Sequence, residues 1–170
     1  VIANDPRKLG GSMDGPASDK FARFIDLFDT FNLPVINFVD QPGFMLGTAA
    51  ENSGVARRGV RALAAVNQAV IPWASVVIRR AFGVAGAGHQ NHSRWNYRVA
   101  WPSGDWGSLP IEGGVMAAYR REIEEAEDPE RRREEIETRL NELRSPFRTA
   151  ESFNIEDIID PRDTRPLLCE

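Results

Sequence analysis

The sequence predicts an α/β fold built around parallel strands. Two short apolar runs, residues 35–39 and 74–78, are bounded by turn-forming residues, as buried parallel strands are. With a short strand expected at residues 1–4 and helical periodicity between the runs, the order is strand, helix, strand, helix, strand. This alternation is typical of a parallel sheet with right-handed helical crossovers.

The composition is that of a globular chain. Its 170 residues are enough for one domain with a real core. Hydrophobic residues make up 42% and charged residues 27%, which excludes disordered, collagen-like and disulfide-scaffold classes. A net charge of −4 gives no general attraction for nucleic acid, so we expect no nucleic-acid partner. The longest apolar stretch, residues 63–71, is far shorter than the roughly 20 residues of a membrane span, so we expect no membrane partner.

The two ends of the chain lead to two further expectations. Residues 1–6 contain no initiator Met, no basic segment and no long apolar segment, so they are not a signal peptide. We therefore expect a piece of a longer protein. The single cysteine, Cys169, cannot form an internal disulfide, which suits a reducing compartment, and we expect the cytoplasm.

The first helix is expected to begin near Ser18, a residue type that favours helix N-caps. It ends at Asn32-Leu33-Pro34. Its apolar residues recur with helical spacing and are mostly aromatic, so we expect this face to be deeply buried. These residues are Phe21, Phe24, Ile25, Phe28 and Phe31.

Further elements follow the two central strands. Helical periodicity predicts one helix over residues 50–69 and another over residues 111–126, with short strands at 97–101 and near Trp106. Asp128-Pro129 then starts a charged helix, which carries a narrow apolar stripe and an otherwise solvated face. The stripe consists of Ile136, Leu140 and Leu143. Short helical turns are expected at Thr149 or Ser152 and at Asp160-Pro161, so that residues 127–170 form a helical C-terminal extension.

Two glycine-containing segments follow the central strands. Residues 40–47 and 83–88 both lie where a parallel sheet places its ligands, at the carboxyl ends of strands. Closely spaced glycines let backbone N–H groups approach a ligand or a developing oxyanion. Spacing alone does not decide between function and structure. An ordinary strand-to-helix connection explains the first segment about as well as a substrate loop does. Tight helix–strand packing explains the second about as well as a ligand site does.

Side-chain chemistry gives no independent assignment. His89 and His92 are the only histidines, and a zinc site would need a third ligand that the sequence does not place near them, so we expect no metal. No G-x-S-x-G motif supports a Ser-His-Asp triad. The role of the two histidines stays open at this stage.

Several segments together resemble one family, the carboxyltransferase (β) subunits of biotin-dependent acyl-CoA carboxylases of the propionyl-CoA carboxylase β type. The most specific is the D-x-P-G-F-x-x-G loop of residues 40–47. The other matching segments are Val1-Ile2-Ala3-Asn4, Ala17-Ser18-Asp19-Lys20, Ala22-Arg23-Phe24, Leu33-Pro34-Val35, Phe38-Val39-Asp40, Arg79-Arg80-Ala81-Phe82-Gly83 and the terminal segment from Ile158 to Arg165.

The resemblance implies a crotonase-like (ClpP/crotonase) α/β fold, with this chain as the C-terminal half of the subunit. Carboxybiotin on a carrier protein would be the carboxyl donor and an acyl-CoA the acceptor. The expected partners are the N-terminal half of the same subunit, further copies in dimers within a larger assembly, and the biotin carboxylase and biotin carrier subunits. Without the N-terminal half, which should bind most of the acyl-CoA, we expect this chain alone to be inactive.

The resemblance also implies site residues. The backbone amides of Val84 and Ala85 would stabilise the ureido oxygen of biotin as an oxyanion hole. The biotin pocket would be lined by Pro42, Gly43, Phe44, Gly47, Gly83 and Gly86. Family members of the propionyl and acetyl type usually carry Tyr-Asp where this chain has Gly86-Ala87, so Ala87 is expected to affect substrate selectivity.

Three alternatives remain at this stage. A biotin-linked acyl-CoA decarboxylase uses related subunits. A hydratase or isomerase of the same fold would need an acidic side chain in the site. A non-catalytic interaction module would use the charged helix near residues 128–144.

Overall fold

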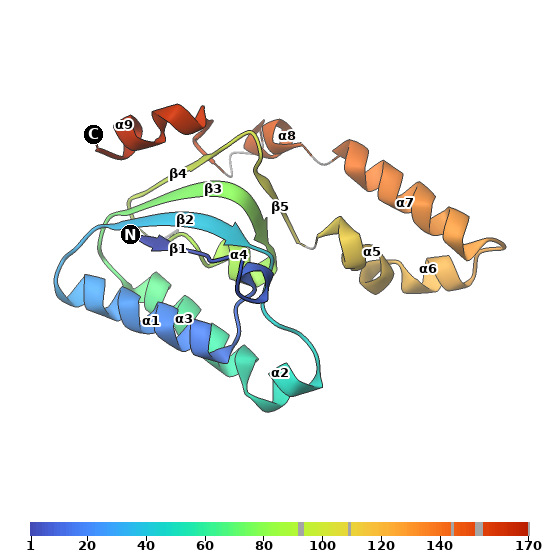
Figure 1. The fold of residues 1–170 in the computed structure, drawn as a ribbon, viewed down its shortest axis with the longest axis horizontal. Coiled ribbons are helices and arrows are strands. Elements are labelled where there is room, and N and C mark those ends of the chain that lie inside the picture. Colours follow the sequence, from blue (N-terminus) through green and yellow to red (C-terminus); the bar gives the residue numbers. More distant parts are fainter. Residues whose placement is uncertain (92–93, 109, 144, 152–154, 170) are drawn as a thin grey trace.

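The computed structural model describes residues 1–91, 94–108, 110–143, 145–151 and 155–169. Within these ranges it contains a six-stranded sheet whose pairings are all parallel. The strand order is β1 (Ile2–Ala3), β2 (Val35–Gln41), β3 (Trp73–Phe82), β4 (Asn96–Ala100) and β6 (Asp157–Ile158), with β5 (Asp105–Gly107) also paired to β3 (Figure 1). The predicted parallel α/β architecture is therefore confirmed.

The first helix, α1 (Gly15–Thr30), begins earlier than the sequence suggested. The side chain of Asp14 is the N-cap and accepts a hydrogen bond from the N–H of Ala17 at 2.8 Å. Pro16 occupies the first turn, where its missing N–H costs nothing. Ser18 lies inside the helix and donates to the carbonyl of Asp14, so the prediction of Ser18 as the N-cap is wrong.

Only part of the aromatic face of α1 is buried. Phe21 and Ile25 are in the core, where α1 packs along α3 (Val55–Gln68). Phe24 and Phe31 are 37% and 64% exposed, so the expectation of deep burial fails for them. Helical spacing identified one apolar face, but α3 covers only one side of that face.

The helix predicted over residues 50–69 is two helices, α2 (Thr48–Asn52) and α3. Gly54 separates them because it adopts a left-handed conformation with φ of 74°. Val60, an apolar residue within this predicted helix, is 65% exposed.

Helices cover both faces of the sheet (Figure 1). On one face, Val35 and Trp73 pack against α1 and α3. On the other, Val76 and Val99 lie side by side in register and pack against the terminal helix α9 (Thr164–Cys169), which contributes Leu167. The central strands β2 and β3 are therefore buried on both sides, which agrees with their nearly continuous apolar sequence.

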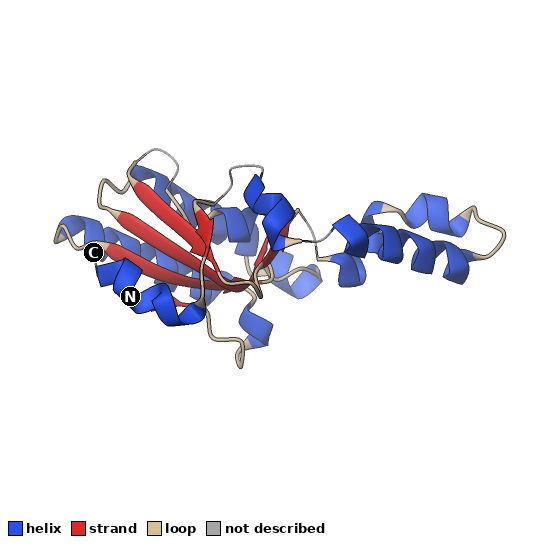
Figure 2. Cartoon of the chain, turned by 90° about the horizontal axis from the view of Figure 1, so that it is seen from above, coloured by secondary structure: helices blue, strands red, loops and turns tan. Residues whose placement is uncertain are grey.

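Residues 111–143 form helices that project beyond the sheet (Figure 2). They are α5 (Ile111–Ala118), α6 (Arg120–Glu124) and α7 (Pro129–Leu143). The expected single helix over residues 111–126 is interrupted at Tyr119. Ile136 of the predicted apolar stripe packs on Val115 and Ile123. The side chain of Leu143, which completes the stripe, lies outside the described part of the chain.

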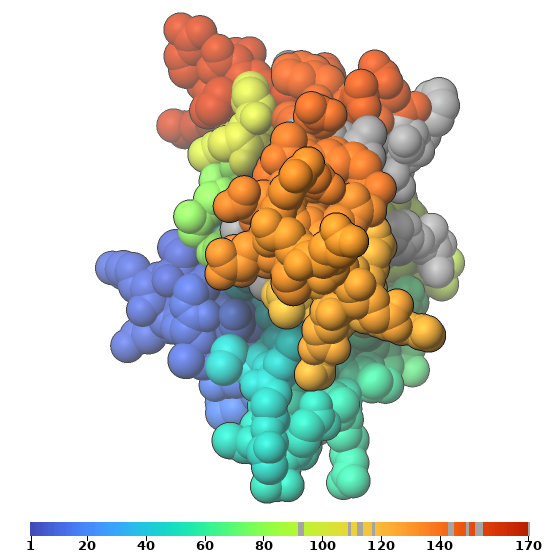
Figure 3. All heavy atoms as spheres, turned by 90° about the vertical axis from the view of Figure 1, so that its right-hand side faces the viewer, coloured from blue at the N-terminus to red at the C-terminus, as the bar shows by residue number. Residues whose placement is uncertain are grey.

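The charged side of α7 faces outward at one end of the molecule (Figure 3). Its Arg131–Glu135 and Arg133–Glu137 pairs are exposed i, i+4 ion pairs, as expected for a solvated face. No helix in the described ranges is both long and apolar enough to cross a bilayer.

Short elements complete the chain. They are η1 (Leu9–Gly11), α4 (Gly83–Ala87), α8 (Pro146–Glu151) and η2 (Pro161–Asp163). The turn expected at Asp160-Pro161 is η2, capped by the Asp160 side chain. Ser152 lies outside the described residues, whereas α8 spans the position of Thr149. The strand β6, which the sequence analysis missed, is only two residues long.

Replacing Asp14 with Ala should lower the free energy of unfolding by about 1 kcal/mol, because the N–H of Ala17 loses its acceptor. Urea unfolding of the chain and the variant measures this difference. Asp26→Ala, an exposed substitution within α1, is the matched control and should change much less. Equal effects of the two substitutions would show that Asp14 does not act as a cap.

Candidate functional site

The two segments singled out from the sequence lie at the same edge of the sheet. Residues 42–47 follow β2 and residues 83–87 follow β3, and these strands are parallel neighbours. Their carboxyl ends therefore point the same way, and α4 lies at this edge (Figure 1). Arg80 also connects η1 to the same edge. This is the edge where open parallel sheets place their ligands.

The glycine-rich segment forms the short helix α4 rather than an open loop. Gly83 begins it in a left-handed conformation, with φ of 60°. A side chain at Gly86 would overlap the backbone of Ala81, and one at Gly88 would overlap Leu63. These two glycines therefore allow α4 to pack closely against β3 and α3.

This packing divides α4 into a buried side and an exposed side. Ala85 and Gly86 are buried, whereas Val84, 63% exposed, and Ala87 face outward. The N–H groups at the start of a helix have no acceptor within the helix. The amides of Val84 and Ala85 belong to this first turn, so they can donate to a group outside α4.

The loop after β2 is fixed by backbone pairing. Met13 donates its N–H to the carbonyl of Gly43, and Met45 donates to the carbonyl of Met13, both at 3.0 Å. Gly43 and Gly47 have φ values of 135° and 104°, which suit glycine. The ring of Phe44 lies against Gly59 of α3 and packs on the core. Phe44 thus anchors this loop to α3.

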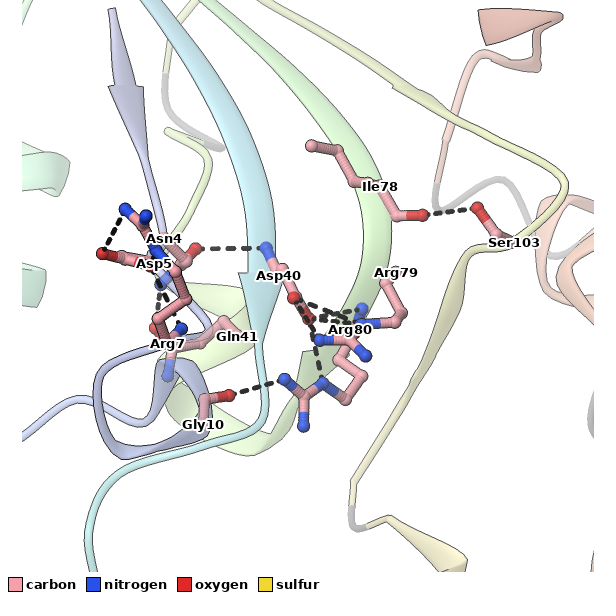
Figure 4. A network of polar contacts seen from close by, with 10 residues as sticks. All are labelled: Asn4, Asp5, Arg7, Gly10, Asp40, Gln41, Ile78, Arg79, Arg80 and Ser103. Atoms are coloured by element: carbon pink, nitrogen blue, oxygen red, sulfur yellow. Dashed lines mark hydrogen bonds and ion pairs between the residues drawn. The ribbon is translucent and has the colours of Figure 1, made fainter.

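A nearly buried carboxylate joins the strands at this edge. Asp40 accepts hydrogen bonds from Arg79 at 2.7 Å and from Arg80 at 2.9 Å (Figure 4). Arg80 also donates to the carbonyl of Gly10 in η1 at 2.6 Å. Burial alone would raise the pKa of Asp40, but the hydrogen bonds from the two guanidinium groups outweigh it and hold this pKa below its usual value of 3.8.

His89 lies just beyond α4 and is buried. Its Nδ1 is 2.8 Å from Nδ2 of Asn37, and its Nε2 is 3.2 Å from Oε1 of Gln41. Burial, aided by the positive charge of Arg98, lowers the pKa of His89 to about 3, so the ring is neutral at physiological pH. The amide nitrogen of Asn37 donates to Nδ1, which assigns the remaining proton to Nε2 and makes Gln41 its acceptor. His92 lies outside the described residues.

The predicted site residues thus lie on two segments at the same edge of the sheet, beside the two cavities described there rather than in their walls. Cavities of about 410 and 630 Å³ border the same edge. Phe82 and Trp106 line the first, and Gln41 and His89 line the second, whereas residues 42–47 and 83–87 line neither. Within the described ranges, no group of three or more His, Cys, Asp or Glu side chains is placed to hold a metal ion.

The sequence analysis missed the polar side chains that organise this edge. Asp40 was treated only as part of a loop, and the neighbouring Arg79 and Arg80 only as part of a family motif. The sequence did contain a usable signal for an ion pair between neighbouring strands. One strand ends with an acidic residue, and the next ends with two consecutive basic residues.

Adding a methyl group at residue 86 should disrupt the packing of α4 against β3. Gly86→Ala places a Cβ about 2.8 Å from the carbonyl oxygen of Ala81, so the helix must move or the chain must lose on the order of 1–3 kcal/mol of stability. Urea unfolding measures the loss. Ala87→Ser, on the exposed side of α4, is the control and should have little effect. A fully stable Gly86→Ala chain with an unshifted helix would contradict the close packing.

The neutral state of His89 predicts how stability depends on pH. The unfolded chain, in which His89 has its ordinary pKa near 6.5, binds a proton that the folded chain excludes down to about pH 3. The free energy of unfolding therefore keeps its full value above pH 6.5. Between pH 6.5 and about pH 3 it falls by roughly 1.4 kcal/mol for each pH unit.

This dependence is measured by urea unfolding of the chain and of His89→Gln between pH 7 and pH 4. As the pH falls, the unmodified chain should lose more free energy of unfolding than His89→Gln does, since glutamine does not titrate. A constant difference across this range would mean that His89 is not buried in its neutral form.

Comparison with known proteins identifies the family. The carboxyl transferase domain model matches residues 1–170. The propionyl-CoA carboxylase carboxyltransferase subunit of Haloferax mediterranei is 39% identical over 167 residues, 97% of this chain and 32% of that protein. The methylmalonyl-CoA decarboxylase subunit alpha of Propionigenium modestum is 30% identical, over 97% of this chain and 32% of that protein.

A solved structure shows the same architecture. The crystal structure of transcarboxylase 12S, a hexamer with methylmalonyl-coenzyme A and methylmalonic acid bound, superposes with a TM-score of 0.86 at 36% identity, covering 98% of this chain and 33% of that one. The chain spans about a third of the length of these relatives. With its crotonase-like parallel α/β fold and a full-length match, the chain belongs to the carboxyl transferase domain family.

Proposed function

We propose that this chain is the biotin-binding half of an enzyme that transfers a carboxyl group from carboxybiotin to an acyl-CoA. One observation supports this most: the family match covers the whole chain, and its most specific motif, residues 40–47, lies at the same edge of the sheet as the first turn of α4. The proposed contribution of this chain is to bind and orient biotin through the backbone amides of the first turn of α4, rather than to attack it with a side chain.

The amides of Val84 and Ala85 are the proposed donors to the ureido oxygen of biotin. The residues present fit such a group, because N–H groups of a first helical turn lack acceptors within the helix and Gly86 lets α4 pack directly on the backbone of β3. Carboxybiotin would supply the carboxyl group and, after losing it, a basic ureido nitrogen. Preorganised amides aimed at developing charge are typically worth about 100- to 1000-fold in rate.

The remaining pocket residues shape the backbone around biotin. In this proposal Pro42, Gly43 and Gly47 set the course of one wall, with Phe44 fixing that wall to α3. Gly83 turns the chain into α4, and Gly86 lets it lie close to β3.

Ala87 is proposed to affect which acyl-CoA is accepted. It is exposed on α4 three residues after Val84, so both side chains lie on the same side of the helix. The family members used for the resemblance usually carry a larger, charged residue at this position. A methyl group leaves more room there, which supports a longer or branched acyl group.

The rest of the site and the partners lie outside residues 1–170 in this proposal. Residues 42–47 and 83–87 line neither of the two cavities described at this edge, which supports a second wall provided by the N-terminal half of a subunit. We propose further copies of the subunit, a biotin carboxylase and a biotin carrier as partners, and the cytoplasm, which the lone Cys169 suits, as the location. This chain alone is then inactive.

A decarboxylase subunit is the second candidate. It is supported by the 30% identity to methylmalonyl-CoA decarboxylase subunit alpha, against 39% for the carboxylase subunit. Both candidates use the same carboxyl exchange with biotin. Purification of the native assembly separates them, because a carboxylase contains biotin carboxylase and consumes ATP, whereas a decarboxylase does not.

Proline substitution tests the donor amides in the full-length enzyme, since proline lacks the N–H and other side-chain changes keep it. Ala85→Pro should lower the rate of carboxyl transfer by at least about two orders of magnitude. Ala85→Gly keeps the amide and should lose little. Transfer of carboxyl groups between biotin and an acyl-CoA is the measurement.

Val84→Pro and a crystal structure of each variant control for distortion of α4. If both proline variants keep an intact α4 and near-normal transfer, the assignment of the oxyanion hole is wrong. Loss of transfer in His89→Ala or His92→Ala alone would then point to a histidine mechanism instead.

A further inference from the structure

A chain of buried hydrogen bonds connects the two segments of the proposed biotin site. It begins at His89, which directly follows Gly88 and is only 2% exposed. The Nε2–H of His89 donates to Oε1 of Gln41, which is the last residue of β2 and has no exposed surface. Nε2 of Gln41 in turn donates to the carbonyl of Gly43 at 2.8 Å. The segment that follows α4 is thereby tied to the loop that follows β2.

Other contacts orient each member of this chain. Asn37 donates to Nδ1 of His89 at 2.8 Å, which fixes the proton on Nε2. Asn4, just after β1, donates to Oε1 of Gln41 at 2.8 Å and accepts the N–H of Asp40 through its own side-chain oxygen. Figure 4 shows Asn4 and Gln41 side by side. Gln41 therefore accepts from both Asn4 and His89, and its amide cannot rotate without losing these bonds.

The backbone of His89 has anchors besides those of its ring, although Asn37 contacts both. Its carbonyl accepts hydrogen bonds from Nε1 of Trp73, at 3.1 Å, and from the hydroxyl of Ser75. Ser75 and Asn37 are partners in register on β3 and β2, so both strands hold this residue. Substituting the imidazole removes the link to Gln41 but leaves these anchors of the main chain in place.

We propose that His89 is a positioning residue, which acts through Gln41 to set the distance between the α4 amides and the loop of residues 42–47. The inference rests on the proposed biotin site and assigns a role to a histidine that does not touch substrate. Both ring nitrogens are engaged in the protein interior, so the ring orients its neighbours and transfers no proton.

The test measures carboxyl transfer by the full-length subunit from a panel of carboxylated acyl-CoAs, starting with methylmalonyl-CoA, to free biotin. His89→Ala should raise the KM for biotin by about 10-fold or more, because a buried Gln41 oxygen loses a donor and the loop shifts. The KM for the acyl-CoA should stay within about twofold, since the link runs only between the biotin-binding segments.

Coupling between the two residues is the second readout. Gln41→Ala should raise the KM for biotin by a similar factor, and the double variant should be no worse than either single variant, since both remove one link. His89→Gln carries an amide donor and should recover part of the biotin affinity. Val76→Ala is the control: it is equally buried but packs on the opposite face of the sheet, so it should lower stability without changing the KM for biotin.

The outcomes distinguish the inference from the function on which it rests. If the unmodified enzyme transfers carboxyl groups but His89→Ala leaves the KM for biotin unchanged, raises both KM values together, or adds to the effect of Gln41→Ala, the positioning role is refuted. If the unmodified enzyme transfers nothing from the whole panel, the proposed function fails. If His89→Ala does not fold, the KM for biotin is compared between the unmodified enzyme, His89→Gln and Gln41→Ala instead.

Discussion

The geometry of the candidate site depends on an irregular pairing between β2 and β3. Val39 lies opposite Val77, but Gln41 lies opposite Ala81, so β3 contains two more residues than β2 over this stretch. In a regular strand, successive side chains point to opposite faces. The shift in register is what allows the consecutive residues Arg79 and Arg80 to reach the same carboxylate, that of Asp40.

One carboxylate therefore fixes several segments at once. Through Arg80, Asp40 is connected to Gly10 in η1, and through its backbone N–H it is connected to Asn4 beyond β1. A nearly buried charge that loses its partners is strongly destabilising, so this arrangement strongly disfavours other positions of the strand ends. Donors and loops held in this way need little rearrangement when a charged group arrives, which is the condition under which fixed dipoles are most effective.

The sequence predicted the parts of the fold that depend on apolar pattern. Residues 35–39 and 74–78 are strands in the structure, and both glycine-containing segments lie at the carboxyl edge of the sheet. Pattern alone failed where one local contact decides the outcome. The Asp14 cap moved the start of α1, the left-handed Gly54 divided a helix, and β6 exists only because it pairs with β4.

The candidate site was predictable to a smaller extent. The backbone amides and loop glycines came from a family resemblance, and their roles stay predictions. The polar cluster around His89 could not be foreseen, because it joins residues 4, 37, 41, 75 and 89, which no local periodicity relates. Buried polar residues break an apolar pattern, and only the fold shows that they satisfy one another.

The way in which α4 packs limits where its sequence can vary. A side chain at Gly86 would overlap the backbone of Ala81, and Ala85 is buried, so substitutions at these two positions disturb the packing of the helix. Val84 and Ala87 extend from the exposed side and can vary without moving the amides. Within this helix, mutational drift and laboratory libraries alike therefore have two positions at which a side chain can change while the backbone keeps its place.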